Sequence, residues 1–255
     1  PMVALFPYIP NNKKNKQGSE ALNPNNLICK SLRLIKSRFP DIGVMCDVAL
    51  DPYTSHGHDG LLIDNEIDND ETIKILVKQA LLQAKCGCDV IAPSDMMDGR
   101  IGLIRKALDK EKFTDVSILS YAVKYASSFY GPFREAVGSK SKLKKDKKTY
   151  QMDHRNSLDS FREVGLDLKE GADMVMVKPG MIYLDIISKI KENFKIPVFA
   201  YQVSGEYSAI KFAIKNKILD EESMIESVMA LKRAGACAIV TYFAMEIAKN
   251  IKISK

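Results

Sequence analysis

Two lysines stand where lysines are uncommon, at the ends of largely apolar runs. Lys178 follows the run 174–177 and precedes Pro179, which ends a sheet ladder, and Lys124 follows the run 118–123 in the same way. Burial disfavours a charged ammonium, and two lysines in one site would lower each other's pKa further. A free amine at working pH is what Schiff-base chemistry on a ketone requires. One such lysine would equally suit an anchor for phosphate or carboxylate, but the pair favours covalent catalysis.

Further polar and ionisable side chains follow other apolar runs along the chain. They are Asp47, Asp51, Ser94, Asp95, Ser204 and Tyr242. The glycine-rich GxGxxG fingerprint of dinucleotide-binding sheets follows none of these runs. A ring of polar residues at the carboxyl ends of many strands is typical of the mouth of a closed parallel barrel, and it disfavours an open doubly wound sheet.

The elements that would position these residues alternate along the chain. Strands are expected at 2–6, 42–49, 89–92, 116–123, 174–177, 196–203 and 237–243. Helical periodicity marks 69–86, 157–170, 183–193, 208–216 and 221–234. Apolar strands that alternate with helices predict an α/β fold with a parallel sheet, here a (β/α)8 TIM barrel.

Such a barrel needs eight strands, and the sequence shows seven. Because the first run opens almost at Pro1, we expect the first βα unit and an N-terminal arm to lie upstream, and 1–255 to be a single, N-terminally incomplete catalytic domain. An unpaired seam would then separate the strands that begin near Met2 and Cys237. The alternative is an overlooked strand between Asp51 and Asp70, a polar stretch that is more typical of a long βα loop.

Composition excludes several classes of protein. The 255 residues are 46% hydrophobic and 27% charged, which excludes a disordered chain, and the apolar runs are far shorter than the roughly 18 residues that cross a bilayer. The net charge of +6 is concentrated in 140–148, which holds six lysines. No RNP, zinc-finger or helix-turn-helix signature accompanies this segment, so nucleic-acid binding is not expected. The five scattered cysteines indicate a reducing compartment, with Cys86 and Cys88 as buried thiols at a helix-to-strand turn.

Several strings, taken together and in order, carry a resemblance to a known family. They are DVALDPYTSHGHDG (47–60), APSDMMDGR (92–100), SYAVKYASSFYGPFREA (120–136), YQMD (150–153), EGADMVMVKPGMIYLD (170–185), YQVSGEY (201–207) and TYFA (241–244). From about Val3 to near Lys249 the sequence resembles the porphobilinogen synthase family, also called 5-aminolevulinate dehydratase. The resemblance implies a lyase that condenses two 5-aminolevulinate molecules to porphobilinogen in tetrapyrrole and heme biosynthesis. A class I aldolase, which needs one imine, and an inactive barrel fragment are the alternatives.

The resemblance also implies roles for individual residues. Lys178 would form the Schiff base with one substrate molecule, on the P side, and Lys124 with the other, on the A side. For the P-side carboxylate it implies Ser204 and Tyr242, with Tyr201 packed beside them.

On the A side the resemblance implies Arg134 and Gln151 as carboxylate ligands. Lys147 stands where many relatives have a further arginine, so a point charge replaces a bidentate fork. It lies in the lysine-rich segment 138–150, which matches the family's active-site lid. The remaining pocket lining would be Tyr130, Phe133, Asp47, Ser94 and Asp95.

Metal use departs from that of zinc-type relatives, which have cysteines where this chain has Ala49, Asp51 and Asp59. Without thiolates a carboxylate site favours Mg²⁺, and no Zn²⁺ is expected. Glu163 resembles the glutamate of an allosteric magnesium site, although its spacing alone would suit a solvated helix residue.

Assembly and compartment follow from the resemblance alone. The family forms octamers through arm contacts, so a homo-oligomer is expected. Members with aspartates at the metal site occur in bacteria and plastids, which implies the bacterial cytoplasm or a plastid-type organelle.

Overall fold

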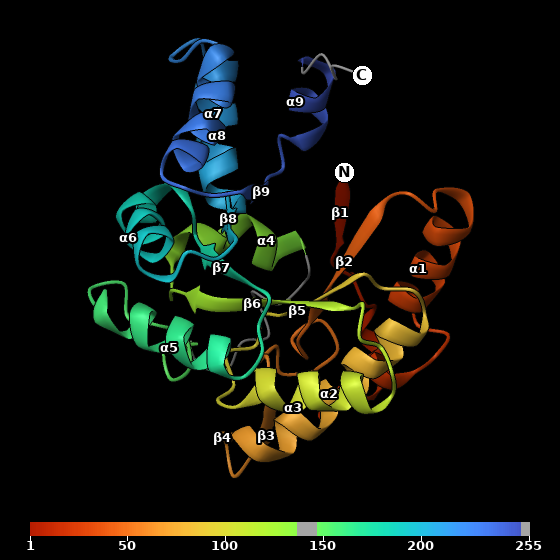
Figure 1. Ribbon diagram of the computed structural model, residues 1–255. Coiled ribbons are helices and arrows are strands. Elements are labelled where there is room, and N and C mark those ends of the chain that lie inside the picture. Colours follow the sequence, from red (N-terminus) through yellow and green to blue (C-terminus); the bar gives the residue numbers. More distant parts are fainter. Residues whose placement is uncertain (137–146, 251–255) are drawn as a thin grey trace.

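The computed structural model describes residues 1–136 and 147–250, without the side chains of 134–136 and 250. Within this part of the chain, seven parallel strands form one sheet in the order β1-β2-β5-β6-β7-β8-β9 (Figure 1). The strands are β1 (Met2–Leu5), β2 (Gly43–Val48), β5 (Val90–Pro93), β6 (Ser117–Lys124), β7 (Met174–Lys178), β8 (Val198–Tyr201) and β9 (Ala238–Val240). Each expected strand is confirmed, with ends that differ by at most a few residues. The barrel-type α/β fold is confirmed with them.

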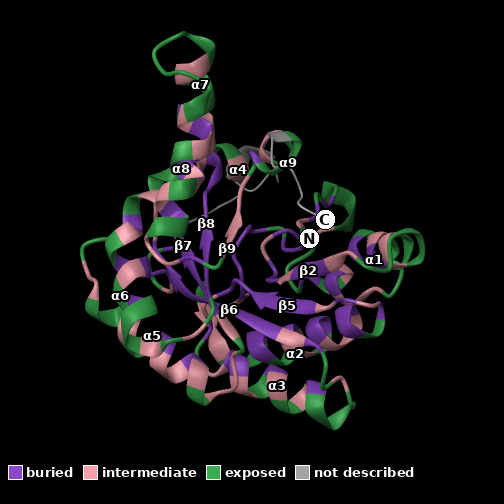
Figure 2. Ribbon diagram, turned by 45° about the horizontal axis from the view of Figure 1, so that its top comes forward, coloured by how far each residue is buried: buried purple, intermediate pink, exposed green. Residues whose placement is uncertain are grey.

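Helices follow the strands and cover the outer face of the sheet (Figures 1 and 2). They are α1 (Leu27–Arg38), α2 (Asn69–Lys85), α3 (Arg100–Lys110), α4 (Gly131–Ala136), α5 (Leu158–Lys169), α6 (Leu184–Phe194), α7 (Ser204–Lys215), α8 (Glu222–Arg233) and α9 (Ala244–Asn250). Helix α7 begins at Ser204, several residues before the expected 208. This shift places Ser204 in the first turn of the helix.

The core has layers on both faces of the sheet. Between sheet and helices, one cluster surrounds Leu32 and Leu76, and a second surrounds Ile186 and Ile190. On the other face a cluster includes Met45, Val90, Leu119, Tyr121, Met176 and Phe199. Figure 2 shows the strands as mostly buried and the outward helix faces as exposed. A sheet buried on both faces explains why the strand sequences are continuously apolar.

The stretch 51–70 differs from its prediction as a strandless loop. It contains an antiparallel hairpin of β3 (Leu61–Ile63) and β4 (Glu66–Asp68). Asp64 and Asn65 take positive φ values of 50° and 63°, as a two-residue hairpin turn requires. The hairpin forms its own two-stranded sheet. It therefore leaves the strand count of the main sheet unchanged.

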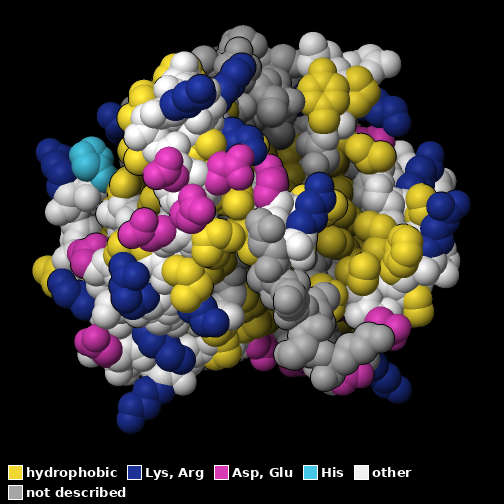
Figure 3. All heavy atoms as spheres, turned by 90° about the horizontal axis from the view of Figure 1, so that it is seen from above, with side chains coloured by type: hydrophobic (Ala, Val, Ile, Leu, Met, Phe, Trp, Pro, Cys, Tyr) yellow, Lys and Arg dark blue, Asp and Glu magenta, His cyan; other side chains and the backbone are white. Residues whose placement is uncertain are grey.

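The two edge strands of the main sheet are β1 and β9, and within the described residues they do not pair with each other. The expected unpaired seam between the first and the last strand is therefore confirmed for the described residues. Met2 and Val3 on β1 are 44% and 40% exposed. Seen from above, hydrophobic side chains gather across the middle of the surface beside a group of acidic ones (Figure 3).

Candidate active site

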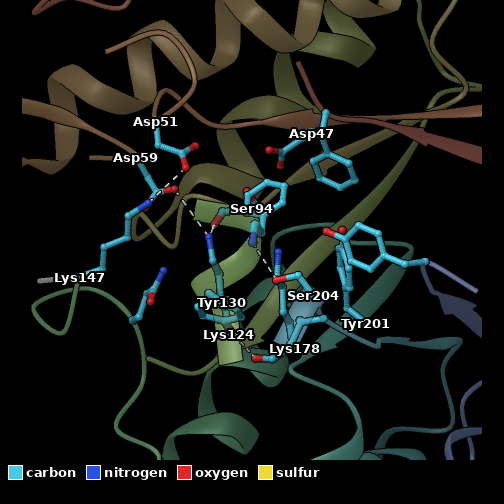
Figure 4. Close-up of a pocket in the computed structure, with 15 residues that line it drawn as sticks. Asp47, Asp51, Asp59, Ser94, Lys124, Tyr130, Lys147, Lys178, Tyr201 and Ser204 are labelled. Atoms are coloured by element: carbon cyan, nitrogen blue, oxygen red, sulfur yellow. Dashed lines mark hydrogen bonds and ion pairs between the residues drawn. The ribbon is translucent and has the colours of Figure 1, made fainter. Parts of the chain in front are cut away.

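One pocket lies at the carboxyl ends of the strands and collects most of the predicted site residues (Figure 4). Its lining is Phe6, Asp47, Asp51, Asp59, Ser94, Lys124, Tyr130, Phe133, Lys147, Gln151, Lys178, Tyr201, Val203, Ser204 and Tyr242. Parallel strands bring their carboxyl ends to one rim, so residues far apart in the sequence meet here.

Lys124 and Lys178 are direct register partners at the ends of the neighbouring strands β6 and β7. They are only 5% and 8% exposed, and Figure 4 shows both side chains reaching into the pocket. Burial, followed by the positive charge of Lys124, lowers the pKa of Lys178 to about 7. A substantial fraction of Lys178 is therefore a neutral, nucleophilic amine at neutral pH.

Aromatic rings surround the Lys178 ammonium. Its Nζ lies 4.3 Å from the ring centroid of Tyr201 and 5.2 Å from that of Tyr121, with Tyr130 and Phe133 at 5.6 and 5.7 Å. Ring faces stabilise the cation by cation–π attraction while they exclude water. Tyr130 also donates from its hydroxyl to the Lys178 backbone carbonyl at 3.2 Å, which holds the strand end in place.

An ion-pair cluster occupies the opposite side of the pocket (Figure 4). Lys147 Nζ lies 2.8 Å from Asp59 Oδ2 and 3.2 Å from Asp51 Oδ2, and Lys124 Nζ lies 3.7 Å from Asp59 Oδ1. Burial opposes charge on Lys147, but the two carboxylates raise its pKa above the ordinary value. Burial likewise opposes charge on Asp59, yet Lys124 and Lys147 hold its pKa below the usual range. The directions of these two pKa shifts favour a charged Lys147 paired with a charged Asp59.

This pairing bears on the predicted metal ligands Asp51 and Asp59. Both carboxylates pair with the Lys147 ammonium, so a metal ion at this place would have to displace that lysine. Within the described residues no group of three or more His, Cys, Asp or Glu side chains is arranged to hold a metal ion. The described lining of the pocket contains no cysteine, and its carboxylate donors are hard oxygens, which Zn²⁺ favours less than thiolates.

Asp47 is a buried carboxyl group in the same pocket. Burial, followed by the charge of Asp51, raises its pKa to about 7, although a hydrogen bond from Ser94 opposes the rise. Its Oδ1 has no hydrogen-bond partner within the described part of the chain. The carboxyl can thus exchange a proton near neutral pH. The neighbouring charges of Lys124 and Lys178 oppose the rise in its pKa.

Ser204, Tyr242 and Gln151 present polar groups to the pocket. Ser204 Oγ accepts a hydrogen bond from Phe133 N at 3.0 Å, which leaves its O–H to donate to a ligand. Tyr242 is 40% exposed at the mouth, with its ring 6.5 Å from that of Tyr201. Gln151 is buried, and its Oε1 has no partner among the described residues. These groups suit a ligand with carboxylates.

Comparison with known proteins decides the family. The family model described as delta-aminolevulinic acid dehydratase matches residues 1–250. The chain belongs to the delta-aminolevulinic acid dehydratase family. It is 58% identical to the delta-aminolevulinic acid dehydratase of Bradyrhizobium diazoefficiens. The match covers 99% of this chain and 72% of the Bradyrhizobium protein. It is 55% identical to the chloroplastic dehydratase of Oryza sativa over 96% of this chain, which spans only 58% of the rice protein.

Solved structures agree with the assignment to the dehydratase family. The porphobilinogen synthase of Toxoplasma gondii, solved with the reaction product porphobilinogen, superposes with a TM-score of 0.95 at 48% identity. The match covers 97% of this chain and 71% of the Toxoplasma chain. The carboxyl transferase domain of Rhizobium etli pyruvate carboxylase, at 16% identity and a TM-score of 0.51, shares the fold alone.

Three site residues expected from the dehydratase resemblance are not among the pocket lining. Asp95 is fully buried beside Arg100, whose Nε lies 3.4 Å from Asp95 Oδ2. Glu163 lies on α5, where burial and the neighbouring charge of Asp167 raise its pKa. The side chain of Arg134 lies outside the described residues, as does most of the segment 138–150 that was expected to be a lid.

Two aromatic residues at the pocket were not predicted from the sequence, Phe6 in its lining and Tyr121 beneath it. Phe6 packs 6.0 Å from the rings of Phe133 and Tyr201. It directly follows β1, but as an apolar residue inside the expected strand 2–6 it carried no sequence signal for the site. Tyr121 lies beneath Lys178, and its buried hydroxyl has no partner within the described residues.

Proposed function

We propose that this chain condenses two molecules of 5-aminolevulinate to porphobilinogen with loss of water. The observation that carries the proposal is the adjacent register of Lys124 and Lys178 in one buried pocket. An aldolase needs one imine-forming amine, whereas two ketone substrates are served by two amines. Family membership supports the same activity, and the chain spans 72% of the Bradyrhizobium relative and 58% of the rice relative.

The chemistry begins at Lys178. Its neutral amine attacks the ketone carbon of one substrate molecule, and loss of water from the resulting carbinolamine gives an imine. Lys124 reacts in the same way with the second molecule. Asp47, with a pKa near that of Lys178, is placed to accept and return protons during these steps.

The two substrate carboxylates would bind on opposite sides of the lysines. Ser204 and Tyr242 donate hydrogen bonds on the P side, next to Lys178. On the A side we assign Gln151, Arg134 and Lys147. Lys147 lines the same pocket but pairs with Asp51 and Asp59, so it would bind the substrate carboxylate only by giving up one of these partners.

We propose Mg²⁺ as the metal ion, held at Glu163 and away from the amines. Glu163 is half-buried, burial and the charge of Asp167 raise its pKa, and its carboxylate oxygens are hard donors that suit Mg²⁺. When bound, the ion would supply charge compensation on α5 and support the fold next to the pocket. Asp51 and Asp59 suit a metal less well because both already pair with Lys147.

We also propose a homo-oligomer, and the bacterial cytoplasm or a plastid as its compartment, since the relatives of similar sequence include a bacterial and a chloroplastic dehydratase. Within the described residues, no helix combines the length and apolar character needed to span a membrane.

The test of the activity is direct. The chain is incubated with 5-aminolevulinate, with and without Mg²⁺, and porphobilinogen is measured by its colour reaction. Borohydride should trap substrate on Lys178, and Lys178→Arg should lower turnover by about a thousandfold or more, because a guanidinium does not form the imine. Lys189→Arg, on the exposed face of α6, is the control. Recovery of the trapped adduct only on other lysines would contradict the assignment.

A further inference from the structure

A buried carboxylate lies just behind the pocket, in the first turn of α7. Glu206 is 3% exposed, and its oxygens accept hydrogen bonds from backbone N–H groups of two different loops. Oε2 accepts from Val203 N at 2.8 Å. Oε1 accepts from Met181 N at 2.8 Å and from Ile182 N at 3.3 Å. The side chain thus joins the β7–α6 loop to the β8–α7 loop.

Each of these loops carries one substrate-binding group. Met181 lies three residues after Lys178, in the loop that leaves β7. Val203 directly precedes Ser204, which presents its hydroxyl to the same pocket. Glu206 therefore connects the loop of the imine-forming amine to the loop of the P-side carboxylate ligand.

The intervening chain leaves little freedom for either loop to compensate. A Cβ on Gly180 would lie 2.9 Å from Leu231 Cδ2 and 3.1 Å from the Tyr201 carbonyl, so this loop packs directly on β8. A Cβ on Gly205 would lie 2.5 Å from the Phe129 carbonyl, so the start of α7 is equally close to its neighbour. Both backbones are thus closely packed, and the Glu206 carboxylate is a side chain that bonds to both of them.

Ordinary helix capping accounts for only part of this arrangement. A glutamate at the third helical position commonly accepts from the N-cap N–H, as Glu206 does from Val203. Capping gives no reason for the bonds to Met181 and Ile182. Burial of a carboxylate is also costly, and here burial raises the pKa of Glu206 while the backbone donors oppose the rise. The additional donors on a second loop indicate a role in joining the two loops.

We propose that Glu206 is a positioning residue that sets the separation between Lys178 Nζ and Ser204 Oγ. This inference rests on the proposed function, because it assumes that the ketone and the carboxylate of one substrate molecule must reach both groups together. A correctly spaced pair holds the ketone against the amine, and small misplacements cost large factors in rate.

The test compares two ketones in borohydride trapping on Lys178. One is 5-aminolevulinate, which has the carboxylate, and the other is aminoacetone, which lacks it. In Glu206→Gln the amide can accept from one loop, but its NH₂ group faces an N–H donor of the other loop. We expect trapping of 5-aminolevulinate to fall by about tenfold or more, with less than about a twofold change for aminoacetone.

Glu222→Gln is the matched control, because Glu222 is an exposed glutamate in the first turn of α8. This substitution should change the trapping of neither 5-aminolevulinate nor aminoacetone. Glu206→Asp serves as a second variant should the glutamine variant fail to fold. It keeps the charge, but one methylene fewer prevents the carboxylate from reaching both loops. Trapping of 5-aminolevulinate relative to trapping of aminoacetone should therefore fall in this variant too. Circular dichroism establishes folding in each case.

The outcomes separate the two proposals. An equal loss for both ketones, or no loss for either, would overturn the positioning role of Glu206. A wild-type chain that is trapped by both ketones but forms no porphobilinogen would overturn the proposed function alone, since the trapping ratio needs no turnover. A wild-type chain that is never trapped on Lys178 would overturn both.

Discussion

The reactivity of Lys178 arises from its surroundings. The side chain is buried among aromatic rings, and its nearest register partner is another lysine. Burial and the neighbouring charge both disfavour the ammonium, and together they bring its pKa to about 7. Asp47 works in the opposite direction, since its negative charge favours the ammonium. The balance leaves an amine that is free near neutral pH.

The first prediction concerns the pH dependence of imine formation. Below its pKa the ammonium has no lone pair, so trapping on Lys178 should fall as the pH drops through about 7. Lys124→Met removes a positive charge, which should raise the pKa of Lys178 and move this midpoint to higher pH. Cyanoborohydride trapping with 5-aminolevulinate, quantified on the Lys178 peptide across a pH series, measures the midpoint. Lys189→Met is the control, and an unmoved midpoint in Lys124→Met would contradict the charge argument.

At the scale of elements, a cluster of buried charges joins the loops around the pocket. Lys147 belongs to the segment that precedes α5, and Asp51 and Asp59 belong to the long connection after β2. All three side chains are largely withdrawn from water. Removal of one partner would leave an uncompensated buried charge, which is far more costly than loss of a surface ion pair.

Lys147→Met should therefore lower the free energy of unfolding by about 3 kcal/mol, measured by urea denaturation. Lys148→Met replaces the exposed neighbour and should stay within about 0.5 kcal/mol of the wild type. Addition of Asp59→Asn to Lys147→Met should recover part of the loss, because it removes one of the unpaired carboxylates. Equal stability of the Lys147 and Lys148 variants would show that the cluster contributes little.

Helix α7 and the short helix η3 (Ser128–Tyr130) are in close backbone contact at Gly205. Gly205→Ala would place a methyl group 2.5 Å from the Phe129 carbonyl, so the helix start must move. The hydrogen bond from Phe133 N to Ser204 Oγ should then be lost.

For Gly205→Ala we expect a stability loss of about 1–3 kcal/mol and a KM for 5-aminolevulinate that rises more than kcat falls. Thermal melts and steady-state kinetics measure the two effects. Gly165→Ala, in the middle of α5 with its nearest neighbour at an ordinary 3.8 Å, is the control and should keep the wild-type KM. A wild-type KM in Gly205→Ala would rule out a role for this contact in substrate binding.

At the scale of the whole molecule, the described sheet has two edges, β1 and β9. Exposed edges present unpaired backbone groups and promote association with other chains. The exposed apolar side chains of Met2 and Val3 add to this tendency. Natural sheets counter such association with a charged residue on the edge strand.

Val3→Lys should accordingly reduce concentration-dependent association of the chain, as followed by light scattering, while trapping on Lys178 stays unchanged. Val3→Ile, which keeps the edge apolar, is the matched control. If both variants associate to the same extent as the wild type, the β1 edge is not the surface through which the chain associates.

The sequence by itself determined the features that depend on local order along the chain. Hydrophobic periodicity predicted the main-sheet strands and most of the helices, because an element that buries one or both faces must show that burial in its residue pattern. The lysines at the ends of β6 and β7 were identifiable since strand ends in a parallel sheet meet at one rim. The family resemblance supplied the remaining site assignments.

Only the tertiary structure decided the features that depend on contacts between distant segments. Lys124 lines the pocket and Tyr121 lies beneath Lys178, although simple alternation would place these two side chains on opposite faces of the sheet. The register of β6 on β7 shifts between Ser120 and Val123, which accounts for the difference. Lys147 pairs with carboxylates nearly a hundred residues away, and Glu206 joins two loops of different strands. Neither contact leaves a periodic trace in the sequence, since each arises from the way the barrel brings separate βα units to one rim.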